Sequence, residues 1–185
     1  MSPLITERIF EGWRKGEPEG YVFASTRSAI GGLVEKYLPT ASDEALLSFG
    51  SVLIEELDTI GSQSASVCYS FLFPETAAEI DFSRYLGPEL QRRDLEAMEL
   101  VITTGGQGRR VTSPANQIED LYESLISTII ANYDFEIAQV LVQMAENDPS
   151  LDKERVCLST YILYSEAMKM PRQNALALLR DMFSQ

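Results

Sequence analysis

The chain has 185 residues, 28 of them acidic and 15 basic, so its formal net charge is −13. This charge disfavours nucleic acids and anionic membranes as partners, because proteins bind both through cationic side chains. The chain contains no histidine, which excludes Ser-His-Asp and Cys-His catalysis and His-ligated zinc. We therefore expect no cofactor and no bound metal. We also expect an acidic surface that is compatible with a basic protein partner.

Apolar residues recur at steps of three and four along most of the chain, which is typical of amphipathic helices. The stripe of Ile118, Leu121, Leu125 and Ile129 is the strongest example. The pattern predicts helices over residues 4–14, 24–38, 42–61, 63–73, 88–104, 115–131, 134–146, 150–169 and 172–183. The fold class is therefore all-α, a single-domain irregular bundle of about 8–9 helices over residues 1–185.

Local signals agree with these boundaries. Thr40 precedes Asp43 by three residues, as in a capping box. Pro88, Pro114 and Pro149 each stand where the first turn of a helix tolerates proline. The stretch "GYVFAS", residues 20–25, is the best strand candidate, although we expect a helix to start there.

Residues 1–20 are expected to form an N-terminal helix and a linker. Trp13 lies in this helix with Ile9 and Phe10. Its indole could anchor a protein partner, or it could dock onto its own domain, as short helices usually do. The first residues lack the pattern of a signal peptide. We therefore expect a soluble chain without direct membrane insertion, and any signal or anchor would lie upstream of Met1.

The segment "GGQGRR", residues 105–110, is rich in glycine and begins a flexible loop predicted over residues 105–114. Glycine amides followed by arginines suit a phosphate cradle, but the preceding strand and the Lys-Ser/Thr pair of such loops are missing. A helix–helix linker is the simpler interpretation. If the loop has a role, Arg109 and Arg110 together with Arg92 and Arg93 would form a basic spot for an acidic partner.

Carboxylates cluster in three places, at Glu55, Glu56 and Asp58, at Glu96 and Glu99, and at Glu119, Asp120 and Glu123. Pairs of carboxylates in a groove can perform acid–base catalysis. A hydrolase without histidine would use Glu55 with Asp58, or Glu119 with Glu123. Each cluster falls largely off the apolar stripe of its helix, so we expect these side chains to face water.

The chain has two cysteines, Cys68 and Cys157, each on the apolar face of a predicted helix. Three interpretations stay open. A catalytic thiolate would need a base that the chain lacks. Two reduced thiols would pack as small apolar groups. A disulfide, the one intrachain pairing that two cysteines allow, would close a loop worth roughly 4–5 kcal/mol in the chain-entropy model and would imply an oxidising compartment.

The segments "CYSFLFP", "VCLSTYILYSEAMKMP" and "LALLRDMFSQ" resemble the helical layout of uncharacterised bacterial envelope-associated proteins, many with an upstream membrane anchor. The resemblance covers about the last two-thirds of the chain and carries no activity. It implies a soluble domain outside the cytoplasmic membrane. We therefore favour an extracytoplasmic over a cytoplasmic location.

These observations lead to one main functional hypothesis and two alternatives. The main hypothesis is a non-enzymatic accessory domain of an envelope-associated protein, which acts by binding another protein. The first alternative is an immunity-type inhibitor whose acidic surface complements a basic toxin. The second is the carboxylate-based hydrolase.

Overall fold

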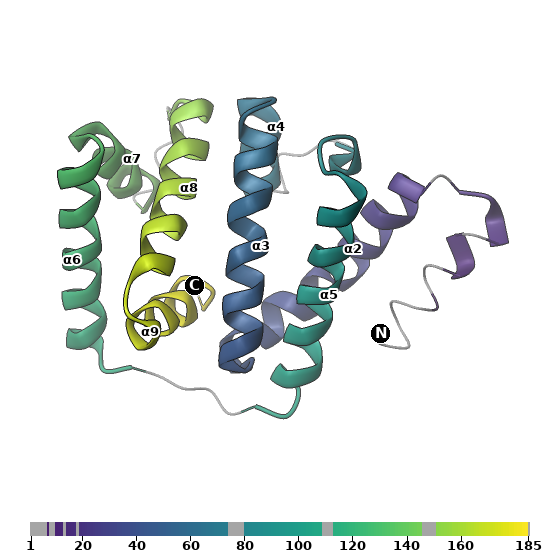
Figure 1. Ribbon diagram of the computed structural model, residues 1–185, viewed down its shortest axis with the longest axis horizontal. Helices are drawn as coiled ribbons and strands as arrows, with labels where there is room; N and C mark the ends of the chain where they lie inside the picture. Colours follow the sequence, from purple (N-terminus) through teal and green to yellow (C-terminus); the bar gives the residue numbers. More distant parts are fainter. Residues whose placement is uncertain are drawn as a thin grey trace. The chain divides into compact units, whose positions relative to one another are not determined.

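The computed structural model describes residues 7, 10–12, 14–17, 19–73, 80–108, 113–145 and 151–184. Every regular element within these residues is helical, so the predicted all-α class is confirmed (Figure 1). The α-helices are α2 (Glu19–Tyr37), α3 (Asp43–Gly61), α4 (Ala65–Leu72), α5 (Pro88–Gly105), α6 (Ala115–Asn132), α7 (Phe135–Ala145), α8 (Lys153–Lys169) and α9 (Arg172–Met182). Two short 3₁₀ helices are η1 (Leu38–Thr40) and η3 (Phe82–Arg84).

Most helix boundaries lie within about two residues of those predicted, and the starts of two helices differ by three residues or more. Helix α2 begins at Glu19 rather than at residue 24, so "GYVFAS" is helical, as expected for that stretch. Helix α8 begins at Lys153 rather than at residue 150. The carboxylate of Asp152 accepts hydrogen bonds from the backbone amides of Glu154 and Arg155, which fixes that start.

The cap of α3 differs from the predicted one. The Ser42 hydroxyl accepts a hydrogen bond from the backbone amide of Ala45, so Ser42 caps the helix rather than Thr40. Thr40 lies in η1 instead, and its hydroxyl donates to the backbone oxygen of Gly105 at 2.9 Å. The predicted cap, Thr40, therefore lies two residues from the observed cap, Ser42.

The chain divides into two compact units, each described by itself. Unit 1 comprises Met1–Leu53, Asp81–Thr112 and Arg180–Gln185, and unit 2 comprises Ile54–Ile80 and Ser113–Leu179. Helices α3 and α9 each contribute residues to both units. The prediction of a single domain over residues 1–185 stays a prediction.

In unit 1, α2 packs against α5, and both contact η1. Its core includes Val22, Ile30, Val34, Leu46, Leu90, Met98 and Val101. The end of α5 lies close against the end of α2, since a side chain on Gly105 would lie 2.5 Å from the backbone oxygen of Tyr37. Gly105 is therefore a packed, buried residue of α5 rather than the start of a loose linker.

In unit 2, α8 is the central helix and packs against α4, α6 and α7. Figure 1 draws α6 and α8 side by side. The core of this unit includes Leu57, Ile60, Leu125, Ile129, Val156, Ile162 and Leu178. The α6 stripe read from the sequence thus supplies buried residues at Leu121, Leu125 and Ile129. Within the described part of the chain, no helix has both the length and the apolar character needed to cross a membrane.

Candidate functional site

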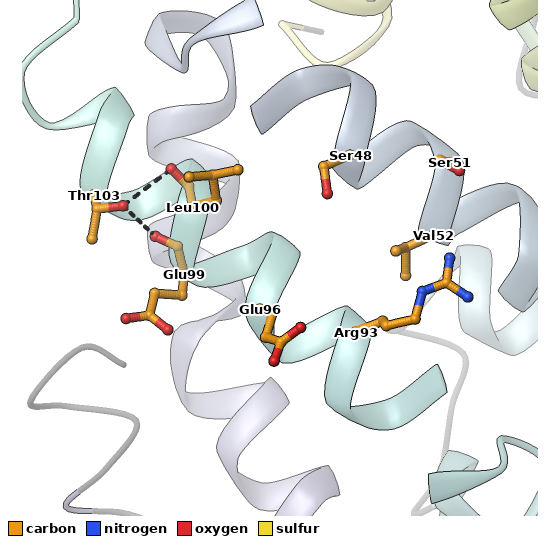
Figure 2. Close-up of a pocket in the computed structure, with 8 residues that line it drawn as sticks. All are labelled: Ser48, Ser51, Val52, Arg93, Glu96, Glu99, Leu100 and Thr103. Carbon is orange, nitrogen blue, oxygen red and sulfur yellow. Dashed lines mark hydrogen bonds between the residues drawn. The ribbon is translucent and has the colours of Figure 1, made fainter. Parts of the chain in front are cut away.

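A groove of about 630 Å³ lies between α3 and α5 in unit 1. One side is formed by Ser48, Ser51 and Val52 of α3. The other side is formed by Arg93, Glu96, Glu99, Leu100 and Thr103 of α5. Figure 2 shows Arg93 extending toward Val52, whereas the Glu99 carboxylate points away from α3. The Thr103 hydroxyl is hydrogen-bonded within its own helix, since it donates to the backbone oxygens of Glu99 and Leu100 (Figure 2).

The charges on this side of α5 are largely paired along the helix. Arg92 donates hydrogen bonds to Glu89 and to Glu96, which lie one turn away on either side. The hydrogen bond from Arg92 lowers the pKa of the exposed Glu89 carboxyl. Because Arg92 is engaged by two carboxylates, this stretch of α5 does not present it as an isolated cation.

The predicted basic spot is therefore only partly visible. Arg92 and Arg93 both lie on α5, with Arg93 in the lining of the α3–α5 groove. Arg109 and Arg110 fall outside the described residues, and so does Trp13. The role assigned to these three residues stays a prediction.

A buried ion pair links α2 to α5 in unit 1. Arg27 Nε donates to Asp94 Oδ2 at 2.9 Å. The Asp94 side chain is 1% exposed and that of Arg27 is 23% exposed. Burial raises the pKa of the Asp94 carboxyl, and the nearby Arg27 guanidinium partly opposes that rise. The pair joins residues 67 positions apart in the sequence, so its clearest role is to hold α2 against α5.

In unit 2, Cys68 of α4 and Cys157 of α8 form a disulfide with their Cα atoms 5.9 Å apart. This resolves the three interpretations of the cysteines in favour of the cross-link. Gly61, the last residue of α3, lies against the sulfur atoms. A Cβ on Gly61 would lie 3.1 Å from Cys157 Sγ and 3.7 Å from Cys68 Sγ. The small residue therefore leaves room for the disulfide beside the helix backbone.

A second groove, of about 260 Å³, opens beside this bond, and we call it the disulfide groove. Its apolar walls include Leu57, Leu158 and Tyr161. Two carboxylates, Asp58 and Glu154, also line it, and no Lys or Arg belongs to its described lining. Gly61 and Cys157 also line this groove.

The carboxylates of the predicted clusters differ in their exposure to solvent. Glu119, Asp120 and Glu123 are exposed on α6, as expected. Glu55 is also exposed, whereas Glu56 is buried at 1% exposure, so the expectation of a solvated cluster is wrong at that position. The physical reason is helix geometry: Glu56 lies between Val52 and Ile60 at steps of four, on the face that α3 buries. Of the proposed catalytic pair, Asp58 lines the disulfide groove and Glu55 does not belong to that lining.

Among the described residues of unit 2, four of the five exposed large apolar side chains lie at the end of α6 and on α7, and the fifth is Leu158 of α8. The exposed fractions are 64% for Phe135, 54% for Val142, 46% for Tyr133 and 41% for Ile130. Residues 113–145, which contain both helices, carry five acidic side chains and no Lys or Arg. We call Ile130, Tyr133, Phe135 and Val142 the acidic–apolar surface.

Sequence reasoning missed this surface although a signal was present. The buried Val140 and the half-buried Ile137 and Met144 form the stripe of α7 that faces the core. Phe135 and Val142 are seven residues apart and fall on the opposite face of the helix, since each residue advances by about 100°. A second apolar stripe, opposite the core, indicates an apolar face of the helix that packing against the core does not explain.

A polar network ties the end of α6 to α8. The Tyr133 hydroxyl donates to Glu166 Oε1 at 2.6 Å, and Lys169 Nζ donates to the same oxygen at 2.5 Å. The hydrogen bond from Lys169, followed by that from Tyr133, lowers the pKa of the Glu166 carboxyl. The same interaction with Glu166 raises the pKa of the Tyr133 phenol. Tyr133 is thereby held in place with its ring partly exposed.

Among the described residues, no group of three or more His, Cys, Asp and Glu side chains is arranged to hold a metal ion. Comparison of the chain with protein-family models, curated proteins and solved structures finds no match. The candidate site therefore depends on the geometry alone. It consists of two grooves and the acidic–apolar surface.

Proposed function

We propose that this chain is a non-enzymatic protein-binding domain of a bacterial envelope-associated protein, and that its partner is basic and apolar. The observation that carries the proposal is the acidic–apolar surface. Exposed aromatic and aliphatic side chains commonly provide the buried centre of a protein interface. Here they stand on a segment that contains carboxylates and no cations.

The charge pattern favours one kind of partner. A segment that offers apolar side chains flanked by Lys or Arg would bury Phe135 and Val142 and would meet opposite charge at the rim. Asp134 and Glu136 flank Phe135 in the sequence. Glu136 is shared with Arg155 of α8 in an exposed ion pair of 2.9 Å, so part of the acidic rim is already compensated within the unit.

The envelope location is supported by the disulfide. Disulfides persist in oxidising compartments and are rare in the reducing cytosol. The bond between Cys68 and Cys157 is consistent with such a compartment and with the sequence resemblance described above.

The proposal is tested by selecting binding peptides from a random display library against the wild-type domain. Counter-selection uses the double variant Phe135→Ser/Val142→Ser. Both side chains are more than half exposed, so we expect this variant to change the free energy of unfolding by no more than about 0.5 kcal/mol. The selected peptides should combine Lys or Arg with large apolar residues and should lose at least tenfold in affinity for the variant. A selection that yields only peptides binding both proteins equally would contradict the proposal.

The same charge pattern favours a second candidate, the immunity-type inhibitor, because a basic toxin is one form of basic partner. Co-expression with a toxic protein encoded beside this one should then restore growth. Variants of the acidic–apolar surface should fail to do so, whereas an accessory domain would leave growth unaffected. No arrangement of the described carboxylates favours the hydrolase over these two.

A further inference from the structure

The disulfide of unit 2 is unequally protected at its two ends. Cys68 is fully buried, at 0% exposure, whereas Cys157 is 5% exposed and lines the disulfide groove. A thiolate that reduces a disulfide attacks one sulfur along the S–S axis, and access decides which sulfur it reaches. In this chain the groove offers a route to Cys157.

Gly61 is what leaves this route open. It lines the groove, and its absent side chain would otherwise lie 3.1 Å from Cys157 Sγ. The space next to the sulfur is therefore bounded by backbone hydrogen rather than by a side chain. A groove of about 260 Å³ is smaller than most ligand pockets and suits a small group such as one thiol-bearing side chain.

The charges of the groove favour one class of thiol. Asp58 and Glu154 are the two acidic side chains in its described lining, which includes no Lys or Arg. Lys153 and Arg155 flank Glu154 in the sequence but do not belong to the described lining: Lys153 Nζ lies 5.2 Å from the centre of the Tyr69 ring, and Arg155 pairs with Glu136. A thiol that carries a positive charge close to its sulfur would be attracted to this site, and an anionic thiol would be repelled.

The geometry points to a thiol–disulfide exchange site in the disulfide groove, where a thiolate next to a positive charge attacks Cys157 Sγ. A new S–S bond forms between the incoming sulfur and Cys157. The bond from Cys157 to Cys68 breaks, and Cys68 Sγ leaves with the electron pair and takes a proton from water. Because Cys68 stays buried beside Cys157, it re-forms the original bond by expelling the incoming thiol unless a second thiol intervenes. The inference is independent of the acidic–apolar surface and of its partner.

The test reduces the oxidised protein with cysteamine, 2-mercaptoethanol and 3-mercaptopropionate, at equal thiolate concentrations and low salt. The reaction is stopped early with iodoacetamide, and peptides are mapped by mass spectrometry. We expect the mixed disulfide on Cys157 and the alkyl group on Cys68, in at least tenfold excess over the reverse. The cationic thiol should react roughly fivefold to tenfold faster than the anionic one, and 1 M salt should remove most of that difference.

Variants separate the contributions of charge and access. Asp58→Asn/Glu154→Gln should abolish the order of the three thiols. The matched control Glu119→Gln/Glu123→Gln removes two exposed carboxylates of α6 and should preserve that order. Gly61→Ala should slow all three reactions by a similar factor, and its melting temperature shows whether folding is retained.

A second arm distinguishes the source of the thiol, with peptides that carry cysteine between two lysines or between two glutamates. A lysine-flanked peptide that reacts at least as fast as cysteamine indicates a protein cysteine as the natural reactant. A peptide that reacts more slowly than cysteamine indicates a small cationic thiol. Attack at Cys68 in the wild-type protein, or equal rates for the cationic and anionic thiols, would overturn the proposal.

Discussion

Unit 1 and unit 2 each contain a carboxyl group that accepts a hydrogen bond from a cation. The pKa of the carboxyl group in unit 1 is raised, whereas the pKa of the one in unit 2 is lowered. Asp94 in unit 1 accepts one hydrogen bond from Arg27, and its other oxygen, Oδ1, is buried without a hydrogen bond from the described residues. Burial raises its pKa. Glu166 in unit 2 accepts from Lys169 and Tyr133 at one oxygen, and its pKa is lowered.

The difference lies in how each charge is compensated. Glu166 is itself only 6% exposed, but its donors Lys169 and Tyr133 are 64% and 46% exposed, and its carboxylate gains two hydrogen bonds from them. The Asp94 charge lies deeper and has one donor, so desolvation outweighs attraction. The presence of a salt bridge in a structure therefore does not by itself show whether the pair stabilises or destabilises the fold.

The two units also differ in how they join distant parts of the chain. In unit 1 the links are polar: Arg27 to Asp94, and Arg180 to Asp43 and to the backbone oxygen of Ala41 at 2.7 and 3.0 Å. In unit 2 the strongest link is the covalent bond between Cys68 and Cys157, which are 89 residues apart. Reducing agents should therefore act on unit 2, whereas the links of unit 1 should respond to pH and to charge changes alone.

The largest expected effect is the loss of the disulfide. Cys68→Ala/Cys157→Ala should lower the free energy of unfolding of unit 2 by about 3–5 kcal/mol, because the unfolded chain gains the entropy that the closed loop denied it. The measurement is hydrogen exchange followed by mass spectrometry, with α4 and α8 as reporters. Ser66→Ala, an exposed substitution on α4, serves as the control. Unchanged protection of α4 and α8 in the double variant would show that the bond does not stabilise this unit.

The next effect concerns the buried ion pair of unit 1. Asp94→Ala should cost about 2–4 kcal/mol, somewhat below the value for fully buried pairs because Arg27 is 23% exposed. The double variant Arg27→Met/Asp94→Leu should recover most of the loss, because apolar side chains need no compensation for desolvation. Chemical denaturation monitored by exchange in α2 and α5 measures both changes. Glu35→Gln on the exposed face of α2 is the control. A double variant as unstable as Asp94→Ala would mean that the charges themselves stabilise the unit.

The smallest effect is the pH dependence that separates the two carboxyl groups. Glu166 has a folded-state pKa below its ordinary value of 4.5. Its contribution to stability is therefore present above about pH 4.5 and is lost as the pH falls toward the folded-state value. Asp94 has a folded-state pKa above its ordinary value of 3.8. Its ionisation therefore costs stability at neutral pH, and the fold gains stability as the pH falls toward 3.8.

Exchange protection of α8 should accordingly decrease as the pH falls below about 4.5, while that of α5 is maintained or increases. Glu166→Gln should flatten the dependence in α8, and Asp94→Asn should flatten that in α5. Tyr133→Phe should remove roughly 0.5–1 kcal/mol above pH 5, where the carboxylate is ionised. Parallel changes in α5 and α8 would contradict the opposite signs of the two pKa shifts.

Much of the helical structure could be predicted because its signals are local. Proline at the start of α5, the apolar stripe of α6 and the period of α3 each act within a turn or two of the backbone. The failures were also local in origin: Ser42 took the capping role assigned to Thr40, and Asp152 fixed the start of α8 at Lys153 rather than at residue 150. Several polar side chains compete for the same few amides, and the geometry of the last residues decides among them.

The candidate site was less predictable, because exposure depends on what packs against each face. Glu56 was expected to face water, and it is buried. Phe135 and Val142 drew no attention as single apolar residues, and they are exposed. For both helices the sequence shows where each side chain lies around the axis, but it does not show which faces a neighbouring helix covers.

The sequence by itself determined that this chain is helical, acidic, without histidine-based chemistry, and able to form one intrachain disulfide at most. Those conclusions follow from composition and from periodicities that operate within single helices. Only the tertiary structure decided that Cys68 meets Cys157 next to Gly61, that Asp94 is buried against Arg27, and that the far face of α7 is exposed. Each of these depends on the packing of segments distant in sequence, which no local pattern of residues specifies.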